Sequence, residues 1–296
     1  MLAFLISILI PVYNYNVVPL ARAIHRQAMA LKTPFEIIIW DDNSSNLCVE
    51  SANKEVEKLQ RVTYIRATEN KGRAASRNAL AETARFKWLL FLDADVLPAS
   101  PHFVENYREH LSKADIIFGG ITYNKERPED KTLRWKYGRA RETQTVKQRK
   151  KKPFISIISQ GFLIKKSLFL RANQFLENRY GLDALFTSNL KKEGATVLHI
   201  DNPVIHQGLE DNKIFMEKSV KAVQSLIYLS EKGLIAKDHY TIQKAALQLE
   251  KYRLTGLFLK CTALFENKIK NNLLSSNPSL FVFDMYRLRI LISNLK

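Results

Sequence analysis

The sequence predicts an α/β fold with a mostly parallel sheet, and two kinds of segment in its first hundred residues support this prediction. Short apolar runs rich in β-branched residues are expected to form strands at 4–10, 35–40, 62–67 and 88–92. Amphipathic segments with helical spacing separate these runs at about 18–31, 47–60 and 73–85. This alternation is typical of βαβ units, and the near-continuous apolarity of the strands indicates burial on both faces.

Further elements are expected along the rest of the chain. Apolar runs at 114–121 and 196–200 predict strands, and the run at 154–164 predicts a strand or a strand pair. From about residue 210 the apolar positions follow helical spacing, as in Met216, Val220, Val223 and Ile227. We therefore expect an α/β domain that ends near residue 208, followed by a helical extension at 209–296.

Two later segments have more than one interpretation. Residues 124–153 are highly charged without a sustained apolar stripe, so they form either a solvated surface or a mobile flap over an anionic ligand. The segment 281–296 is apolar but contains Asp284, Arg287 and Arg289. Either the carboxy-terminal helices pack on the catalytic domain, or this segment lies in a membrane interface with its basic residues against anionic head groups.

The composition is that of a folded chain with a surplus of positive charge. Of 296 residues, 46% are hydrophobic and 25% are charged, and 10 Gly with 9 Pro argue against long disordered tracts. The 46 Lys and Arg residues exceed the 29 Asp and Glu residues, which gives a formal net charge of +17. This surplus favours anionic partners, namely phosphorylated small molecules, anionic membrane surfaces or nucleic acid. The sequence has no homeodomain, zinc-finger or RNA-recognition signature, so we expect no nucleic acid partner.

The amino-terminal residues and the two cysteines bear on the compartment. The opening "MLAFLISILIPVYN" lacks a basic region and a cleavage site, which predicts a buried first strand rather than a signal peptide. No uncharged stretch approaches the roughly 18 to 20 residues that span a bilayer. Cys48 and Cys261 lie far apart, and we expect both to be reduced and to act as small hydrophobic side chains. We expect a cytoplasmic protein, either free or attached peripherally to the inner face of the cell membrane.

Polar clusters follow three of the predicted strands, at the point where each strand ends. They are "PVYNYN" at 11–16, "DDNSS" at 41–45 and "DADV" at 93–96. The carboxyl ends of parallel strands meet at one edge of a sheet, which is where open α/β sheets bind ligands. We therefore expect the three clusters to form one ligand site.

Asp93 and Asp95 are candidates for a divalent metal site. They lie two apart after a buried strand, so both point toward one ion, or one toward an ion and the other toward a ribose. Hard cations prefer carboxylate oxygens and bridge them to phosphate, whereas the plain alternative is a solvated, capped turn. Asp41 and Asp42 end the second strand, where they either start a helix or offer an acid that accepts hydrogen bonds from a base or ribose.

The segment "ENKGRAASRNALAE" at 69–82 is a candidate for anion binding. Asn70 and Gly72 lie in a turn, and the helix that follows presents free N–H groups and a positive dipole end. Arg73 and Arg77 lie four apart on one face of this helix. The two arginines are either ordinary surface residues or part of a phosphate site.

The sequence resembles glycosyltransferase family 2 in four motifs that occur in this order and spacing, "SILIPVYN", "FEIIIWDDNSS", "NKGRAASRN" and "WLLFLDADVLP". The resemblance implies the GT-A fold, in which a Rossmann-like, mostly parallel sheet is flanked by helices. It implies a catalytic domain at 1–208, with a donor half at about 1–120 and an acceptor half at about 121–208. The helical extension at 209–296 would follow this domain.

The resemblance also implies roles for individual residues. Those assigned to the nucleoside pocket and its base are Pro11, Tyr13, Asn14 and Asp41. Those assigned to the nucleotide or donor are Asn70, Gly72 and Arg77. Asp93 would face the ribose or the metal, and Asp95 would coordinate the metal, Mg²⁺ or Mn²⁺. His206 would be a late ligand of the metal or the diphosphate, since imidazole binds Mn²⁺, whereas His199 inside an apolar strand is expected in the core.

The general base that the resemblance implies is Asp183. The family's base is the Asp of a Glu-Asp pair that follows a glycine turn and leads into a helix. The matching segment here, "ENRYGLDALFTSNLKKEG" at 177–194, has the turn and the helix but a single acid at that place. A capping role for Asp183 is the alternative, and Glu177 is a distant reserve for the base.

The expected function is transfer of a sugar from a nucleotide-sugar donor, with a UDP-sugar expected first, to an acceptor hydroxyl with inversion. The acceptor would be a glycan or a lipid-linked molecule in polysaccharide or glycolipid assembly. Two alternatives stay open at this point. A sugar-phosphate nucleotidyltransferase shares the nucleotide-binding fold, although "PVYNYNVVP" is not its glycine- and arginine-rich loop. The single acid at Asp183 is also consistent with a non-catalytic relative that binds nucleotide sugars.

Overall fold

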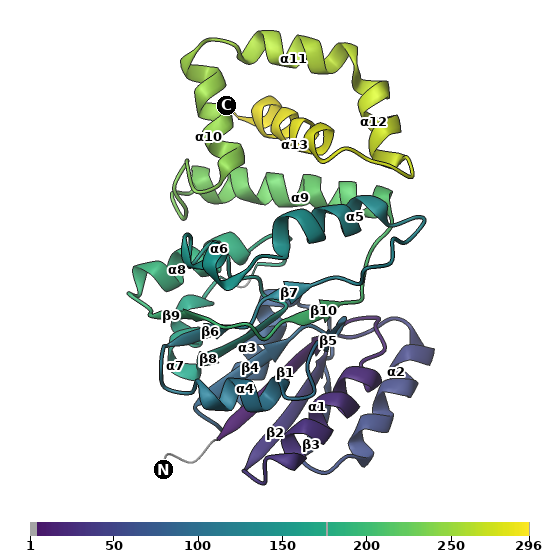
Figure 1. Cartoon of the computed structure of the whole chain (residues 1–296), viewed down its shortest axis with the longest axis vertical. Coiled ribbons are helices and arrows are strands. Elements are labelled where there is room, and N and C mark those ends of the chain that lie inside the picture. The colour runs from purple at the N-terminus through teal and green to yellow at the C-terminus, as the bar shows by residue number, and fades with distance from the viewer. Residues whose placement is uncertain (1–4, 176, 296) are drawn as a thin grey trace. The chain divides into compact units, whose positions relative to one another are not determined.

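The structure, a computed structural model, describes residues 5–175 and 177–295, and the chain divides into two compact units. The first, which we call the sheet unit, comprises Met1–Asn124, Glu142–Asn178 and Phe186–Gly208. The second, the helical unit, comprises Lys125–Arg141, Arg179–Leu185 and Leu209–Lys296. Figure 1 labels the elements of both units.

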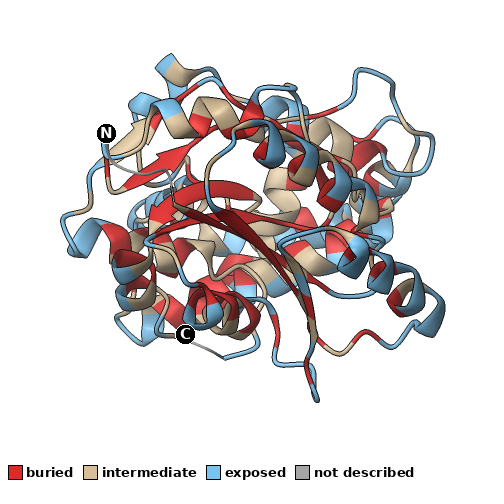
Figure 2. Cartoon of the chain, turned by 90° about the horizontal axis from the view of Figure 1, so that it is seen from below, coloured by how far each residue is buried: buried red, intermediate tan, exposed pale blue. Residues whose placement is uncertain are grey.

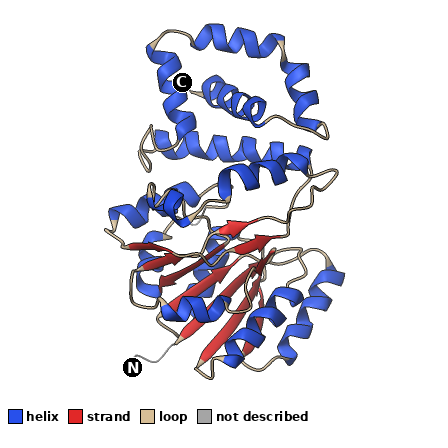
Figure 3. Cartoon of the chain, viewed as in Figure 1, coloured by secondary structure: helices blue, strands red, loops and turns tan. Residues whose placement is uncertain are grey.

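A seven-stranded sheet forms the centre of the sheet unit (Figure 3). Its strands, in spatial order, are β3 (Val62–Arg66), β2 (Phe35–Asp41), β1 (Ile6–Val12), β4 (Trp88–Leu92), β8 (Gly161–Lys165), β6 (Ile116–Phe118) and β9 (Val197–His199). Every neighbouring pair is parallel except the two pairs that involve β8. The predicted α/β fold with a mostly parallel sheet is therefore confirmed.

The strands are buried on both faces, as their continuous apolarity predicts. All five residues of β4 are buried, and Ile8 of β1 lies between Ile37 of β2 and Leu90 of β4. Figure 2 shows this burial along the sheet. On β4, Phe91 packs against Phe169 with ring centroids 4.4 Å apart, so a rigid apolar core supports the end of this strand.

Helices cover both faces of the sheet. Those of the sheet unit are α1 (Val18–Ala30), α2 (Leu47–Asn53), α3 (Arg73–Thr83), α4 (Phe103–Glu109), α6 (Val146–Lys150), α7 (Lys166–Ala172) and most of α8 (Asp183–Lys192). The chain moves from β1 to β2 in one direction and from β3 to β4 in the other, so right-handed crossovers place α1 and α3 on opposite faces. The helix expected at 47–60 is shorter, because its second half is a 3₁₀-helix at Lys54–Lys58.

A second, three-stranded sheet consists of β5 (Val96–Pro98), β10 (Val204–His206) and β7 (Ile121–Thr122). β10 is the middle strand, antiparallel to β5 and parallel to β7. The register pairs His206 with Val96, the residue directly after Asp95. Since β5 follows the Asp93–Asp95 turn at once, this pairing brings a late segment of the chain to the end of β4.

Two predicted strands differ from the structure. The run at 114–121 forms two short strands, β6 and β7, because the chain passes from the large sheet to the small one at Gly119 and Gly120. Gly120 has φ +102°, a conformation that disfavours other residues. In the run at 154–164 only β8 is a strand, because Phe154 packs on the core from a turn and Ile158 packs on it from an irregular segment. The apolar pattern around these two residues therefore resembles that of a strand, although neither residue takes part in strand pairing.

The charged segment at 124–153 contains more regular structure than expected. α5 (Thr132–Tyr137), a π-helical turn (Gly138–Glu142) and α6 lie within it. Arg149 of α6 is buried and donates to the carbonyl oxygens of Phe118, Gly119 and Ile200 at 3.0, 3.2 and 2.9 Å. Helices of about one or two turns are too short for the periodicity that identifies longer ones, which is why the sequence did not predict them.

The helical unit consists mainly of α9 (Asn212–Glu231), α10 (Thr241–Lys251), α11 (Thr255–Leu264), α12 (Glu266–Leu274) and α13 (Leu280–Asn294), together with α5. α13 packs against each of the other four carboxy-terminal helices (Figure 1). Phe283, Leu291 and Ile292 of α13 are buried in two apolar clusters. The expected helical extension is confirmed, and α13, which contains most of the segment 281–296, packs as a helix within this unit.

Cys48 and Cys261 are both free and both exposed, so neither of these small side chains is part of a buried core. Cys48 lies on the first turn of α2, where Glu50 and Asn53 make the buried contacts, and Cys261 lies on the outer side of α11. Among residues 5–175 and 177–295, no helix combines the length and apolarity that crossing a membrane requires.

Candidate active site

The ends of β1 and β2 bring the first two polar clusters together in the sheet unit. Asp41 ends β2 opposite Val12 of β1. The Asn14 backbone N–H donates to Ser44 Oγ at 2.8 Å, and Asn14 Nδ2 donates to Ser45 Oγ at 3.0 Å. Asn14 has φ +50°, a left-handed conformation that Asn tolerates in turns. The "PVYNYN" and "DDNSS" segments therefore form one edge of the site.

The remaining residues of the first cluster differ in exposure. Pro11 is half-buried within β1, opposite Trp40, whereas the Tyr13 side chain is 49% exposed. Tyr15, to which the sequence assigned no role, is half-buried; burial raises the pKa of its hydroxyl, and the charge of nearby Asp95 raises it further. Tyr15 therefore connects the first cluster to the third. In the sequence, Tyr15 could have been identified as a site residue because it is the second tyrosine of the "PVYNYN" cluster.

Asp41 is fully buried, and both of its carboxylate oxygens bind groups of the protein. Oδ1 accepts from the Ser44 N–H at 2.7 Å, and Oδ2 accepts from the Tyr64 hydroxyl. Burial raises the pKa of Tyr64, and the hydrogen bond to Asp41 raises it further, so the hydroxyl stays a donor at neutral pH. Asp41 thus anchors the turn after β2, and each oxygen retains a second lone pair for a donor on a ligand.

Asp42, which the sequence did not single out as a separate residue, holds the turn before α3. Its carboxylate accepts from the Lys71 and Gly72 N–H groups at 2.9 and 2.8 Å. Its carbonyl oxygen accepts from Asn70 Nδ2 at 3.0 Å. Gly72 has φ +84°, and an added Cβ would lie 2.3 Å from Asn178 Oδ1. Asn70 and Gly72 are therefore shaped by Asp42, and part of the N–H array expected to bind an anion is already used.

Arg77 of α3 pairs with Asp93 at the end of β4. The Arg77 guanidinium donates to Asp93 Oδ1 in a buried ion pair, and it also donates to the Ser159 carbonyl oxygen at 3.3 Å. The two residues are only 7% and 5% exposed. A buried carboxylate needs such a partner, because an uncompensated charge in the interior is costly. The structure thus brings Arg77 to Asp93 rather than leaving it on an open helix face.

Asp95 and His206 form the closest acid–histidine pair of the site. His206 Nε2 lies 3.2 Å from Asp95 Oδ2, and the His206 side chain is buried. Burial raises the pKa of Asp95, but the hydrogen bond to His206 and the positive charges of His206 and Arg73 outweigh it, so the pKa lies below its ordinary value. Asp95 is therefore ionised at neutral pH and available to a cation.

The backbone after His206 is fastened to Asp95. The Gln207 and Gly208 N–H groups donate to the Asp95 carbonyl oxygen at 2.8 and 3.3 Å. A Cβ on Gly208 would lie 2.3 Å from Asp95 Oδ2, so only glycine leaves room for this carboxylate. Gly208 was not predicted as a site residue, and its position two residues after His206 was the only signal in the sequence.

Tyr123 and Glu142 lie behind His206. His206 Nδ1 is 3.4 Å from the Tyr123 hydroxyl, and that hydroxyl donates to Glu142 Oε2. A Tyr hydroxyl has one proton, so its oxygen accepts from an Nδ1–H of the imidazole. Because Nδ1 keeps its own proton, a cation bound by His206 would replace the Nε2 proton that bonds Asp95. Nothing in the sequence pattern pointed to Tyr123 or Glu142.

These atoms fit a divalent cation with few protein ligands. Among the described residues, Asp93 Oδ2 and Asp95 Oδ1 are buried without a hydrogen-bond partner. Two ligands in neighbouring positions of an octahedral Mg²⁺ site lie about 3 Å apart, close to the separation of Asp95 Oδ2 and His206 Nε2. The described part of the chain contains no group of three or more His, Cys, Asp or Glu side chains placed to hold an ion. Water and phosphate oxygens would complete such a site.

Asp183 is the first residue of α8 and belongs to the helical unit. Burial raises the pKa of Tyr240, and the charge of Asp183 raises it further, so the two side chains are neighbours. Glu177, the reserve base, is exposed in the sheet unit. His199 on β9 is buried, with Nε2 2.9 Å from the Pro153 carbonyl oxygen, which confirms its place in the core.

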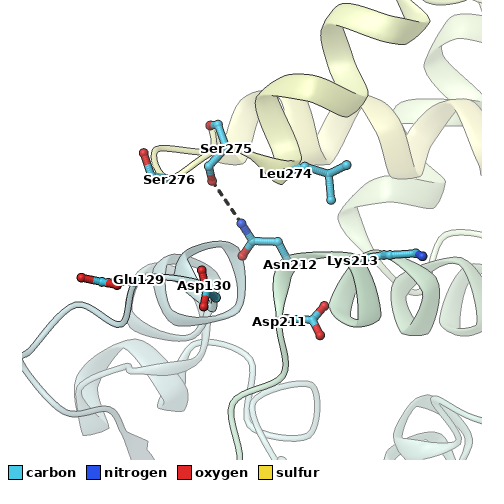
Figure 4. A pocket seen from close by; sticks show the side chains of 8 residues that line it. All are labelled: Glu129, Asp130, Asp211, Asn212, Lys213, Leu274, Ser275 and Ser276. Atoms are coloured by element: carbon cyan, nitrogen blue, oxygen red, sulfur yellow. Dashed lines mark hydrogen bonds between the residues drawn. The ribbon is translucent and has the colours of Figure 1, made fainter.

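A hollow of about 260 Å³ lies within the helical unit (Figure 4). Its lining residues are Glu129, Asp130, Asp211, Asn212, Lys213, Leu274, Ser275 and Ser276. Asn212 Nδ2 donates to the Ser275 carbonyl oxygen at 3.1 Å across one side of it. Three carboxylates and one lysine line the hollow, a charge balance that disfavours a diphosphate.

Curated relatives share the first part of the chain. An uncharacterised glycosyltransferase of Haemophilus influenzae is 32% identical over 134 residues, which cover 40% of this chain and 42% of that protein. A poly(ribitol-phosphate) beta-glucosyltransferase of Bacillus spizizenii is 34% identical over 120 residues, which cover 39% of this chain and 19% of that protein. The matches thus span less than half of the length of these relatives.

Solved structures share the fold over a longer stretch. A mannosyltransferase from Pyrobaculum calidifontis in complex with GDP-Man and Mn²⁺ has a TM-score of 0.60 and 15% identity, covering 97% of this chain and 85% of that one. S. aureus TarS (residues 1–349) in complex with UDP-GlcNAc has a TM-score of 0.51 and 16% identity, covering 97% and 90%. At these identities the likeness shows that the chain has the GT-A fold.

The family comparison covers the site at the edge of the sheet. Residues 7–170 match the model of the family described as Glycosyl transferase family 2. The match spans more than half of the chain and includes the segments around Asn14, Asp41, Gly72 and Asp95, whereas Asp183 and His206 lie beyond it. The chain therefore belongs to glycosyltransferase family 2.

Proposed function

We propose that this chain is an inverting glycosyltransferase that uses a divalent cation to transfer a sugar from a UDP-sugar to an acceptor hydroxyl. The observation that carries the proposal is the placement of Asp95 beside His206 at the end of β4, next to the turns after β1 and β2. The UDP-GlcNAc complex of S. aureus TarS supports a UDP-sugar as the first donor to test. The Mn²⁺ complex of the P. calidifontis enzyme supports a cation.

Asp95 and His206 would hold Mg²⁺ or Mn²⁺, with the unpartnered oxygen of Asp93 directed to the ion or to the donor ribose. Such an ion would neutralise the charge that builds on the departing diphosphate. Arg77 fixes the orientation of Asp93 through their ion pair. Pro11, Tyr13, Asn14 and Asp41 would surround the nucleoside, and Asn70 with Gly72 would shape the turn that faces the donor.

Asp183 is our candidate for the general base. In a single displacement it would take the proton of the acceptor hydroxyl while that oxygen bonds to the anomeric carbon, and the bond to the nucleoside diphosphate breaks on the opposite face. Its place in the first turn of α8 supports this role, because the positive end of the helix dipole stabilises the ionised carboxylate that accepts the proton.

The acceptor would be a glycan or a lipid-linked molecule in polysaccharide or glycolipid assembly, and the protein would work in the cytoplasm or at the inner face of the cell membrane. The net charge of +17 supports anionic substrates and surfaces. The relative whose name specifies an activity on poly(ribitol-phosphate) supports a polymeric acceptor. We include no nucleic acid among the partners.

A non-catalytic nucleotide-sugar binder is the second candidate, because Asp183 stands alone where a Glu-Asp pair is expected. Asp183→Asn separates the two. In an enzyme this variant keeps donor binding but loses transfer, whereas a binder shows donor binding without turnover in the wild-type protein across an acceptor panel. Release of pyrophosphate from a nucleoside triphosphate and a sugar phosphate would instead indicate a nucleotidyltransferase.

The main test measures binding of UDP-sugars and release of UDP with Mn²⁺ and after its removal by EDTA. We expect Asp95→Asn to lower Mn²⁺ affinity on the order of tenfold or more and to remove the metal-dependent release of UDP. Glu57→Gln, which changes an exposed acid of the sheet unit, is the matched control and should behave like the wild-type protein. Unchanged metal-dependent turnover in Asp95→Asn would overturn the proposal.

A further inference from the structure

α11 of the helical unit is apolar around most of its circumference although one side of it faces solvent. Its inner side is accounted for by packing: Phe258 and Leu259 join the apolar cluster formed by α9, α10 and α13. Thr262 is buried, and its carbonyl oxygen accepts from Arg289 of α13 at 3.4 Å. The inner side alone is therefore sufficient to hold α11 on the unit.

The outer side of α11 and its two ends carry six exposed residues, which we call the α11 face. They are Tyr252, Leu254, Leu257, Cys261, Leu264 and Phe265. The three leucines are 43%, 61% and 80% exposed, and the two aromatic residues are 66% and 47% exposed. The leucines and the cysteine follow at spacings of three, four and three, which places them on one helical stripe. In water a surface helix has polar residues on this side.

The charges around the α11 face are mostly positive. Residues 250–265 include exposed Lys251, Arg253 and Lys260 and one exposed acid, Glu250. Lys251 Nζ lies 5.9 Å from the ring centroid of Tyr252 at one end of the stripe, and Lys268 Nζ lies 5.5 Å from that of Phe265 at the other. Cationic groups therefore flank the apolar stripe at both ends.

The two acids that flank this segment along the chain, Glu250 and Glu266, offset these charges only in part. Glu266 begins α12, and its carboxylate is already bound by Lys270 at 2.7 Å and by Arg289 at 2.9 Å. These contacts hold the pKa of Glu266 at about 2, the hydrogen bond to Lys270 being the largest cause. Lys251, Arg253 and Lys260 together exceed the charge of Glu250, so this surface keeps a positive surplus that an anionic partner would complement.

We propose that the α11 face docks into the interface of an anionic membrane, with the helix lying in the membrane plane. Leu257 and Leu264 enter the boundary between head groups and acyl chains, and the basic residues contact the anionic head groups. α11 has ten residues, about 15 Å of helix, which suits a position in the plane and is too short to span the bilayer. This inference deepens the membrane location in the proposed function and uses none of the residues of the donor site.

A second copy of this chain is a poorer occupant for the face. A symmetric contact between two α11 faces would oppose Lys251, Arg253 and Lys260 of both copies, and one exposed acid per copy, Glu250, is too few to compensate them. Like charges placed across an interface cost several kcal/mol and steer association away from it. Anionic lipid provides negative charge for the basic residues and an apolar phase for the apolar residues of the α11 face.

Flotation of the full-length protein with vesicles tests the assignment. We expect it to float with vesicles of phosphatidylcholine mixed with phosphatidylglycerol and to bind vesicles of phosphatidylcholine alone much more weakly. The double variant Leu257→Ser/Leu264→Ser should lose about tenfold or more in affinity for the mixed vesicles, because two apolar side chains leave the interface. Lys251→Gln and Lys260→Gln should each lose about fivefold on the mixed vesicles only.

Leu47→Ser is the matched control, since it removes a leucine that is 69% exposed on the sheet unit, and it should float like the wild-type protein. If the double leucine variant binds mixed vesicles as tightly as the wild type, attachment uses another basic surface and the assignment is wrong. A lipid-free dimer that the same variant dissociates would instead identify the face as a contact between copies and would also overturn it.

The same variants separate this inference from the proposed reaction. Mn²⁺-dependent binding of a UDP-sugar, measured without lipid, should be unchanged in Leu257→Ser/Leu264→Ser. Vesicle binding should likewise be unchanged in Asp95→Asn. Failure of the first experiment alone overturns the membrane face, and failure of donor binding in the wild-type protein alone overturns the proposed function.

Discussion

His206 Nε2 lies 3.2 Å from Asp95 Oδ2, although 111 residues separate the two along the chain. The contact is fixed by strand pairing, because β10 runs antiparallel to β5 and the register places His206 opposite Val96. An oxygen and a nitrogen that both carry lone pairs are held together by a proton or by a cation between them. The four predictions below follow from the groups that surround this pair and from the core that supports it.

Tyr123→Phe should lower Mn²⁺ affinity about ten- to a hundredfold with little loss of stability. The variant removes the oxygen that lies 3.4 Å from His206 Nδ1, so the imidazole is no longer held with its Nε2 toward Asp95. Manganese binding followed by electron paramagnetic resonance measures this without any turnover. Glu142→Gln should have a weaker effect in the same direction, and unchanged affinity in Tyr123→Phe would show that Tyr123 does not orient His206.

Gly208→Ala should weaken metal binding by about tenfold or more, because the new methyl group would lie 2.3 Å from Asp95 Oδ2 and displace the carboxylate. Gly256→Ala in α11 is the matched control, since no atom lies within 4 Å of its added Cβ. That control should keep metal affinity and raise stability by up to about 1 kcal/mol. Equal metal affinity in the two variants would contradict the close approach of Gly208 to Asp95.

Arg77→Met should lower the free energy of unfolding by about 3 to 5 kcal/mol, because it leaves the carboxylate of Asp93 buried without a counter-charge. Adding Asp93→Asn should recover part of this loss. Arg171→Met breaks an ion pair whose Nε–Oε2 distance is 2.7 Å but whose arginine is 53% exposed, and it should cost within about 1 kcal/mol. Denaturant titration measures all three, and similar losses in both arginine variants would contradict a buried pair.

His199→Gln should flatten the dependence of stability on pH between about 4 and 6.5. Burial lowers the pKa of His199 to about 4 from its ordinary value of 6.5, and the charges of Arg149 and Lys150 act in the same direction. The unfolded chain therefore binds a proton at a higher pH than the folded one. Stability is fully present above about pH 6.5 and is lost as the pH falls toward 4, by up to about 3 kcal/mol.

Thermal unfolding of His199→Gln across this pH range provides the measurement. The glutamine keeps an N–H for the Pro153 carbonyl oxygen but does not titrate. His102→Gln, which changes a histidine whose side chain is 68% exposed, is the control and should keep the slope of the wild-type protein. A slope in His199→Gln equal to that of the wild type would assign the pH dependence to other groups.

The fold and one edge of the site could be predicted from the sequence because their signals are local. Strands buried on both faces must be continuously apolar, so β1, β2 and β4 appear directly in the pattern. The carboxyl ends of parallel strands share one edge of the sheet, so the sequence alone predicts that the clusters at Asn14, Asp41 and Asp95 lie together. Helices of more than two turns could also be predicted, because their apolar residues recur along the sequence with the helical period.

Only the tertiary structure decided the contacts between distant segments, because they depend on register and packing rather than on local spacing. The approach of His206 and Gly208 to Asp95 results from the pairing of β10 with β5. The core surrounds α13, which leaves the apolar side of α11 exposed, although α13 had the more conspicuous sequence. The sequence shows that a residue is apolar but not whether its side chain faces the core or solvent. The positions of its neighbours in space determine which of the two it faces.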